Sequence, residues 1–292
     1  MAVKLKFSKK VREAKESSLP MLALESTIIA HGMPYPKNLE FAKEAESICE
    51  SLGVVPATIA ILNGEICVGL ESFELKKISN SRRIQKVSSR ELGLATSLGW
   101  DGATTVSSTM RIAKNNNIEV FSTGGIGGVH RQAEQTFDIS QDILALSQVS
   151  MLVVSSGAKS VLDLAKTLEL LETFGVSVVG FKTNNFPSFY SRSSGLSKIN
   201  RVDSPKEIVE TFINNQLLKL PCSTLVSNPV PIENEILPTK IDSVIKKALI
   251  ALKKNQVSGK AVTPFLLDEI FKETKGKSLE TNISLALNNV KL

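Results

Sequence analysis

Short apolar runs alternate with amphipathic stretches along most of the chain. Runs typical of buried strands occupy residues 21–29, 56–62, 118–122, 150–155, 176–181 and 223–227. Apolar residues recur at helical spacing elsewhere, which predicts helices at residues 38–52, 107–115, 161–173, 205–219, 239–255, 263–274 and 278–290. Strands that alternate with helices are typical of a layered α/β fold with a largely parallel sheet.

One turn signal adds an antiparallel pair to this sheet. Asn63-Gly64 separates the run 56–62 from the apolar run 65–70, and Asn-Gly between two such runs is a strong hairpin signal. We therefore predict a mixed sheet. No internal repeat or linker rich in Pro, Gly or Ser divides the sequence, so we predict a single domain over residues 1–292.

The composition is that of a globular protein, with 42% hydrophobic and 22% charged residues. No apolar run approaches the ~20 residues that span a bilayer, so we expect no membrane partner. The basic N-terminal segment has no apolar core and contains Glu13 and Glu16, which argues against a signal or transit peptide. We expect a cytoplasmic location. Three scattered cysteines without a CxxC pair argue against a zinc site or a disulfide framework.

The net charge of +6 is compatible with nucleic acid or with an anionic small molecule. Lys and Arg are dispersed along the chain, and aromatic residues make up only 5% of it. A stacking surface for bases is therefore poorly supplied. We predict a small-molecule ligand and no nucleic-acid partner.

Ligands of parallel α/β sheets bind beyond the carboxyl ends of the strands, so polar residues that end apolar runs are candidates. These are Glu25-Ser26-Thr27, Lys86, Thr104-Thr105, residues 123–130, residues 155–160 and Lys182-Thr183. Lys159 follows a buried strand, where desolvation would free its amine for Schiff-base chemistry, although a lysine in this position can also simply be solvated. Glu25 interrupts an apolar run and is either a general acid with a raised pKa or a structural carboxylate.

Residues 123–130 read TGGIGGVH, and this glycine-rich loop is either an anion-binding turn or a tight structural turn. Asp138 and Asp142 share a helix face if both are helical, and they suit a hard divalent cation; the alternative is a helix N-cap at Asp138 or Ser140. We interpret the two histidines, His31 and His130, as structural side chains with satisfied hydrogen bonds.

Eleven ordered blocks together resemble the pseudouridine-5′-phosphate glycosidase family, also described as indigoidine synthase A-like. The blocks are ALESTIIAHGMPYPKN, VPATIAI, KVSSREL, GATTVSSTM, STGGIGGVHR, AEQTFDIS, SSGAKSVLDL, LETFGV, SNPVP, TPFLL and SLETNI. They cover nearly the whole chain from about residue 20 to residue 290. The resemblance implies a three-layer α/β/α sandwich, assembled as a homotrimer.

The resemblance also implies an activity, the reversible cleavage of pseudouridine 5′-phosphate to uracil and ribose 5-phosphate, with degradation as the expected direction. The family's residues fall on Glu25 as general acid and on Lys159 as the lysine that forms a ribose imine. Expected substrate contacts fall on Lys86, Val106, Ser140, Gln141, Asp142 and Asn282. The family's manganese ligand falls on Asp138, so Mn²⁺ is the expected cofactor.

The sequence departs from the family's SRRD block, which reads Ser88-Ser89-Arg90-Glu91 here. If the lost arginine contacts the phosphate, affinity falls, because serine cannot make a bidentate charged contact. Other hypotheses remain open. They are another sugar-phosphate lyase or aldolase that uses a lysine imine, and a ligand-binding accessory protein without catalysis.

Overall fold

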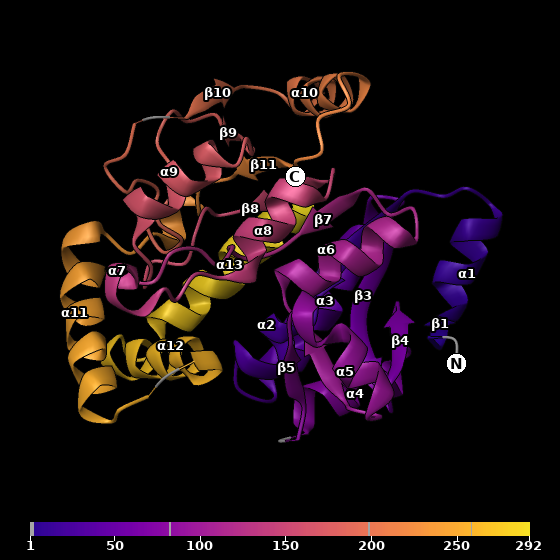
Figure 1. Cartoon of the computed structure of the whole chain (residues 1–292), viewed down its shortest axis with the longest axis horizontal. Coiled ribbons are helices and arrows are strands. Elements are labelled where there is room, and N and C mark those ends of the chain that lie inside the picture. The colour runs from indigo at the N-terminus through magenta and orange to yellow at the C-terminus, as the bar shows by residue number, and fades with distance from the viewer. Residues whose placement is uncertain (1–2, 82, 198, 258) are drawn as a thin grey trace.

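The computed structural model describes residues 3–81, 83–197, 199–257 and 259–292. In these residues eleven strands form one sheet, with helices on both faces (Figure 1). The strands are β1 (Leu5–Phe7), β2 (Met21–Glu25), β3 (Val55–Leu62), β4 (Glu65–Val68), β5 (Gln85–Val87), β6 (Gly102–Thr104), β7 (Val120–Ser122), β8 (Leu152–Ser155), β9 (Ser177–Phe181), β10 (Asn200–Val202) and β11 (Thr224–Ser227).

The helices match most of the predicted amphipathic stretches within a few residues. They are α1 (Lys9–Glu16), α2 (Thr27–His31), α3 (Lys37–Ser51), α4 (Ser72–Asn80), α5 (Leu92–Ser97), α6 (Val106–Asn115), α7 (Ala133–Thr136), α8 (Gln141–Gln148), α9 (Leu164–Thr173), α10 (Pro205–Leu217), α11 (Pro238–Lys254), α12 (Val262–Glu273) and α13 (Lys277–Lys291). Short 3₁₀ turns are η1 (Ser89–Glu91), η2 (Ile232–Asn234) and η3 (Gly259–Ala261). No helix in the described part of the chain is long and apolar enough to cross a membrane.

The sheet is largely parallel, in the order β1-β4-β3-β2-β7-β8-β11-β9-β10. The antiparallel pairs are β3 with β4 and β3 with β6. Asn63 and Gly64 join β3 to β4 and both have positive φ, 51° and 74°, as a two-residue hairpin turn requires. The predictions of a hairpin and of a mixed, mostly parallel sheet are confirmed.

Helices α6 and α8 lie in front of the sheet in Figure 1, and α3 and α13 lie behind it. At the other end of the sheet, Ile208 and Phe212 of α10 pack against Leu152 and Val154, side chains on one face of β8. Burying apolar side chains on both faces of a parallel sheet requires a helical layer on each side. The three-layer α/β/α sandwich is confirmed.

The predicted strand 21–29 is wrong in its second half, because the chain leaves the sheet at Glu25. The hydroxyl of Ser26 donates to the carbonyl of Ile59 at 2.6 Å and accepts from the N–H of Thr104 at 2.9 Å. A serine side chain thus makes the bonds that strand backbone would make. The next five residues form α2, and Glu25 is left at the carboxyl end of β2.

Candidate active site

A cavity of about 950 Å³, open mouth included, lies at the carboxyl ends of β2 and β5 and beside the loops that follow β7 and β8. We call it the polar lobe. It gathers most of the residues expected from the sequence: Glu25, Lys86, Val106, Asp138, Ser140, Gln141, Asp142 and Lys159. The remaining one, Asn282, lines an adjoining space together with Ile28, Phe189 and Leu267, which we call the apolar lobe. The two lobes share Glu25, Lys86 and Lys159.

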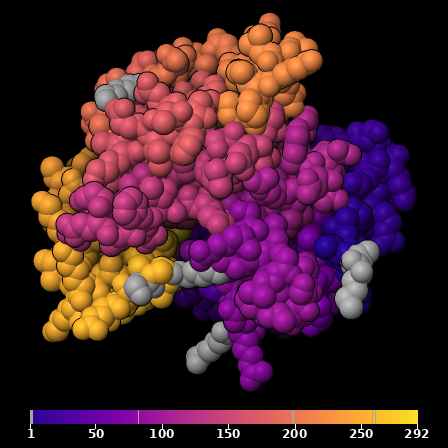
Figure 2. Space-filling model, in the orientation of Figure 1, coloured from indigo at the N-terminus to yellow at the C-terminus, as the bar shows by residue number. Residues whose placement is uncertain are grey.

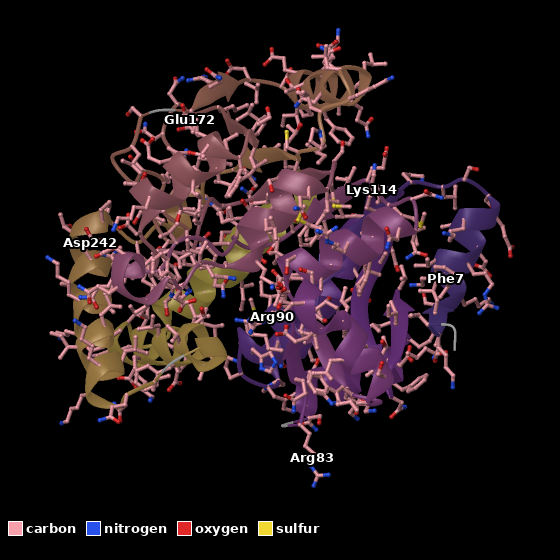
Figure 3. The ribbon with its side chains drawn as sticks, viewed as in Figure 1. Phe7, Arg83, Arg90, Lys114, Glu172 and Asp242 are labelled. Carbon is pink, nitrogen blue, oxygen red and sulfur yellow. The ribbon has the colours of Figure 1, made fainter. Side chains whose placement is uncertain are left out.

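Segments far apart in the sequence build this cavity. Figure 2 shows the C-terminal helices in yellow, the region near residue 135 in magenta and the region near residue 90 in purple meeting on one face of the molecule. In Figure 3, Arg90 lies near the middle of that face, whereas Arg83 extends from the edge into solvent. Arg90 lines the polar lobe. The site is therefore a tertiary feature that no single motif contains.

Glu25 is almost completely buried, with 5% of its surface exposed. The hydroxyl of Thr123, which begins the glycine-rich loop, donates a hydrogen bond to its Oε1. Burial raises the pKa of Glu25, and the nearby charge of Lys159 and the Thr123 hydrogen bond offset only part of this effect. A carboxyl group with a raised pKa holds its proton at higher pH, which suits a general acid.

Lys159, on the loop after β8, lines the same cavity as this carboxyl group. Its backbone N–H donates to the carbonyl of Ile126 at 3.1 Å, and its carbonyl accepts from Leu162 N–H at 3.0 Å. These bonds fix the backbone on both sides of the side chain, which is half-buried. Its charge is the strongest influence that lowers the pKa of Glu25. An amine and a protonatable carboxyl group thus face the same space.

Both carboxylate oxygens of Asp142 bind backbone. Oδ1 accepts from the N–H of Ser107 at 3.0 Å, and Oδ2 accepts from the N–H of Gly127 at 2.9 Å. Asp142 is 5% exposed and lies in the first turn of α8. It lines the polar lobe, but its geometry is that of a clamp between the start of α6 and the glycine-rich loop.

The glycine-rich loop packs closely against its surroundings. A Cβ on Gly127 would lie 2.3 Å from Ser140 Oγ, and one on Gly128 would lie 2.4 Å from Thr167 Oγ1. The N–H groups of Ile126 and Gly127 are used by Gly157 O and Asp142. The glycines therefore serve close packing, and of the two readings of this loop the geometry supports the structural turn.

Asp138 and Asp142 do not share a helix face, because α8 begins only at Gln141. Ser140 is the N-cap of α8, and its Oγ accepts from Asp142 N–H at 3.2 Å. The alternative prediction, a helix N-cap at Asp138 or Ser140, is therefore confirmed at Ser140. Gln141 turns back to the SSRE block, where its Oε1 accepts from Ser89 Oγ and from Arg90 N–H, each at 3.0 Å.

The local structure explains how the chain accommodates Ser88-Ser89-Arg90-Glu91 in place of the family's SRRD block. Ser89 does not line the cavity, whereas its neighbours Ser88 and Arg90 do. Glu91 caps η1, since its Oε2 accepts from the N–H of Ser88 at 2.9 Å. The longer carboxylate thus has a capping role in this chain, and Arg90 is the cation of this block that lines the polar lobe.

Asp138 is the carboxylate of the polar lobe that suits a cation. Its side chain is 42% exposed, and Oδ2 lies 3.8 Å from Nδ1 of His130. In the described residues no cluster of three or more His, Cys, Asp or Glu side chains could hold a metal ion. One carboxylate beside an imidazole nonetheless fits a hard divalent cation that keeps most of its waters.

The interpretation of the histidines as satisfied structural side chains is wrong for His31, because its Nε2 is buried without a hydrogen-bond partner in the described structure. His130 lines the polar lobe beside Asp138; it belongs to the candidate segment 123–130, but sequence reasoning assigned no specific role to its side chain. Thr263 of α12 was missed, since nothing in its surrounding sequence marks a ligand contact. Lys182-Thr183 ends β9 as predicted but does not contribute to either lobe.

The fold and this cavity define an α/β protein with a lysine–carboxyl pair at the carboxyl ends of its strands. The family described as indigoidine synthase A like protein matches residues 10–292, and the chain belongs to that family. It is 48% identical over 288 residues to the pseudouridine-5′-phosphate glycosidase of Geobacillus kaustophilus, covering 99% of this chain and 96% of that protein. It is 44% identical to the Staphylococcus aureus protein of the same name, covering 99% and 94%.

Solved structures with the same fold include an indigoidine synthase A-like protein of Thermotoga maritima. It superposes with a TM-score of 0.91 at 36% identity, covering 99% of this chain and 94% of that one. A second is the prealnumycin C-glycosynthase AlnA in complex with ribulose 5-phosphate, with a TM-score of 0.90 at 33% identity, covering 100% and 95%.

Proposed function

We propose that this chain cleaves the carbon–carbon glycosidic bond of pseudouridine 5′-phosphate, giving uracil and ribose 5-phosphate. The observation that carries the proposal is the pairing of buried Glu25 with Lys159 in one cavity, in a chain whose full-length relatives are named for this reaction. That AlnA was solved with a pentulose phosphate supports a sugar phosphate as ligand. We propose degradation as the favoured direction.

The two lobes orient the substrate. The N-termini of α6 and α8 both reach the polar lobe, where Lys86 and Arg90 add positive charge, and helix N-termini with cations favour a phosphate. The apolar lobe suits the uncharged base. Because Glu25 and Lys159 line both lobes, the bond between sugar and base lies next to them.

The scissile bond joins C1′ of the ribose to C5 of the base, and carbon is a poor leaving group. Glu25 donates its proton to the ring oxygen O4′ as the C1′–O4′ bond breaks, and the amine of Lys159 forms a bond to C1′. The nitrogen returns a proton to the Glu25 carboxylate, and its lone pair then forms a C1′=N imine while the C1′–C5 electron pair leaves to C5, which takes up that proton. Water hydrolyses the imine and releases ribose 5-phosphate. In sum, pseudouridine 5′-phosphate and water give uracil and ribose 5-phosphate.

We propose Mn²⁺ as a cofactor held by Asp138, whose carboxylate lies beside the imidazole of His130. When bound, a divalent cation would supply positive charge for the phosphate and sugar oxygens. The rest of the chemistry lies with Glu25 and Lys159. We further propose a homotrimer in the cytoplasm, as the family resemblance implies.

The direct test is synthesis, because the reaction is reversible. Wild-type protein incubated with uracil, ribose 5-phosphate and Mn²⁺ yields pseudouridine 5′-phosphate, detected by chromatography and mass. Protein without uracil gives no such product. A folded protein that breaks ribose 5-phosphate into smaller carbon fragments instead would move the assignment to an aldolase.

A further inference from the structure

Asn289, in the last turn of α13, is a buried side chain that the mechanism above does not use. Only 1% of its surface is exposed. Helix α13 lies behind the sheet in Figure 1, and Asn289 reaches from it to the residues that directly follow β7 and β8. Strand β7 leads into the glycine-rich loop, and β8 leads into the loop that carries Lys159. One side chain thus contacts both loops.

The amide group of Asn289 is bonded through its nitrogen and through its oxygen. Nδ2 donates to the carbonyl of Thr123 at 2.8 Å and to Oγ of Ser156 at 3.2 Å, and it lies 3.4 Å from the carbonyl of Gly124. Oδ1 accepts from Nδ2 of Asn228 at 3.1 Å. Because a carbonyl can only accept, the nitrogen of the amide has to face the glycine-rich loop. The amide is therefore held in one orientation.

Each loop contact lies close to a catalytic group. Thr123, whose carbonyl Asn289 binds, donates through its own hydroxyl to the carboxyl group of Glu25. Ser156 lies three residues before Lys159, and its N–H donates at 2.9 Å to a carbonyl of the glycine-rich loop. The two loops are thus bonded to each other and to α13. A movement of either loop changes the distance between the general acid and the lysine.

We propose that Asn289 is a positioning residue that holds Glu25 and Lys159 at the separation the reaction needs. The inference rests on the proposed function and adds the part of the fold that sets the geometry of the catalytic pair. Asn289 acts through Thr123 and Ser156, and its side chain lies outside the lining of both lobes. A misplacement of reacting groups by about 1 Å can cost about 100-fold in rate, so a residue that touches no substrate can still control it.

The test replaces Asn289 with Leu, which has a similar volume and no hydrogen-bonding group. Asn288→Leu is the matched control, because Asn288 lies in the same turn of α13 and its side chain donates to the carbonyl of Pro229 at 3.4 Å. Cleavage of pseudouridine 5′-phosphate is followed by the release of uracil. We measure kcat, KM and the pH dependence of kcat/KM, and circular dichroism shows whether each variant is folded.

Asn289→Leu should lower kcat about 10- to 100-fold and change KM much less, because the residues that line the cavity remain while the catalytic pair is misplaced. Borohydride trapping with ribose 5-phosphate should slow for the same reason, since the loop of Lys159 has lost its bond to α13. Asn288→Leu should keep the wild-type kcat.

The alkaline limb of the pH–rate profile separates a positioning role from a merely structural one. The hydrogen bond from Thr123 lowers the pKa of Glu25, so loosening Thr123 raises that pKa further. In Asn289→Leu the alkaline limb should therefore move to higher pH. The substitution leaves in place the charged groups that act on Glu25, which are Lys159, Asp142 and Lys86.

A wild-type kcat in folded Asn289→Leu would overturn the inference, and so would a lower kcat with an unmoved alkaline limb. If Asn289→Leu does not fold, Asn228→Leu carries the test, because it removes the donor to Oδ1 of Asn289. That variant should move the limb in the same direction with a smaller loss of kcat, and an unchanged kcat and limb would equally refute the positioning role. Failure of the wild type to release uracil would instead refute the proposed function.

Discussion

Oδ2 of Asp142 accepts a hydrogen bond from the backbone N–H of Gly127 at 2.9 Å. The other carboxylate oxygen accepts from the start of α6, so one side chain links α6 to the glycine-rich loop. That loop begins with Thr123, which donates to the carboxyl group of Glu25. The position of Glu25 therefore depends on an aspartate whose two carboxylate oxygens both bind backbone.

Replacing Asp142 with Asn should destabilise the protein by about 1–3 kcal/mol, because an amide nitrogen cannot accept and one backbone N–H is left unpaired in a buried place. Urea unfolding monitored by circular dichroism measures the loss. Asp242→Asn is the matched control, since Asp242 is exposed on α11 (Figure 3). Equal stability of the two variants would show that Asp142 does not clamp the loop.

Replacing Glu25 with Gln should lower kcat by about 10²–10⁴-fold, the contribution typical of a positioned general acid. Because burial raises the pKa of Glu25, the wild-type kcat/KM should fall as pH rises through that pKa, where the donated proton is lost. The variant has no proton to lose there. A pH–rate profile with the same alkaline limb in both proteins would assign the limb to another group.

The raised pKa of Glu25 also affects stability. The folded state binds this proton more tightly than the unfolded chain, in which the carboxyl group titrates near 4.5. The free energy of unfolding contributed by Glu25 therefore falls as pH rises from about 4.5 to the folded-state pKa, and stays low above it. Glu25→Gln should gain stability relative to wild type on going from pH 4 to pH 8. If the urea midpoints of wild type and Glu25→Gln differed by the same amount at pH 4 and at pH 8, this prediction would be contradicted.

Replacing Arg90 with Ala should raise KM for the phosphorylated substrate about fivefold, because an exposed cation that is also paired with Glu91 contributes about 1 kcal/mol. Arg90 lines the polar lobe, while Ser89 does not. Ser89→Ala, which removes only the hydrogen bond to Gln141, is the control and should change KM much less. The effect of Arg90 should shrink at high salt. If Ser89→Ala raised KM as strongly, position 89 would be the one that matters for phosphate binding.

Removal of the Asp138 carboxylate should weaken Mn²⁺ binding. Asp138→Ala should bind Mn²⁺ at least about tenfold more weakly, since hard cations depend on charged oxygen ligands. The concentration of free Mn²⁺ is measured by electron paramagnetic resonance, without reference to activity. Asp242→Ala serves as a control that likewise removes one negative charge. Equal Mn²⁺ affinity of the two variants would place the cation elsewhere.

The sequence predicted the layers of the fold, because burial on both faces of the sheet leaves a strong apolar pattern. The parallel strands and the hairpin at Asn63-Gly64 followed from that pattern. Strands β5 and β6 were not predicted, since each has only three residues and shows no period. The end of β2 at Glu25 depends on the bonds of Ser26 to β3 and β6, which are tertiary contacts.

Residue types along the sequence predicted only part of the candidate site. Lys159 and Glu25 could be singled out as polar residues at strand ends, but the family resemblance was needed to join them in one mechanism. The clamp made by Asp142 depends on the spacing of α6, α8 and the glycine-rich loop in three dimensions. The unpaired Nε2 of His31 likewise becomes visible only when its surroundings are known.

The covalent role of Lys159 is the central claim, and borohydride trapping tests it most directly. Protein incubated with ribose 5-phosphate and reduced should gain the mass of ribose 5-phosphate less one oxygen atom, with the label on the peptide that contains Lys159. Lys159→Ala should gain none, while Lys166→Ala, which removes an exposed lysine paired with Glu134, should label like wild type. No adduct in folded wild-type protein, or equal labelling of Lys159→Ala, would contradict the imine mechanism.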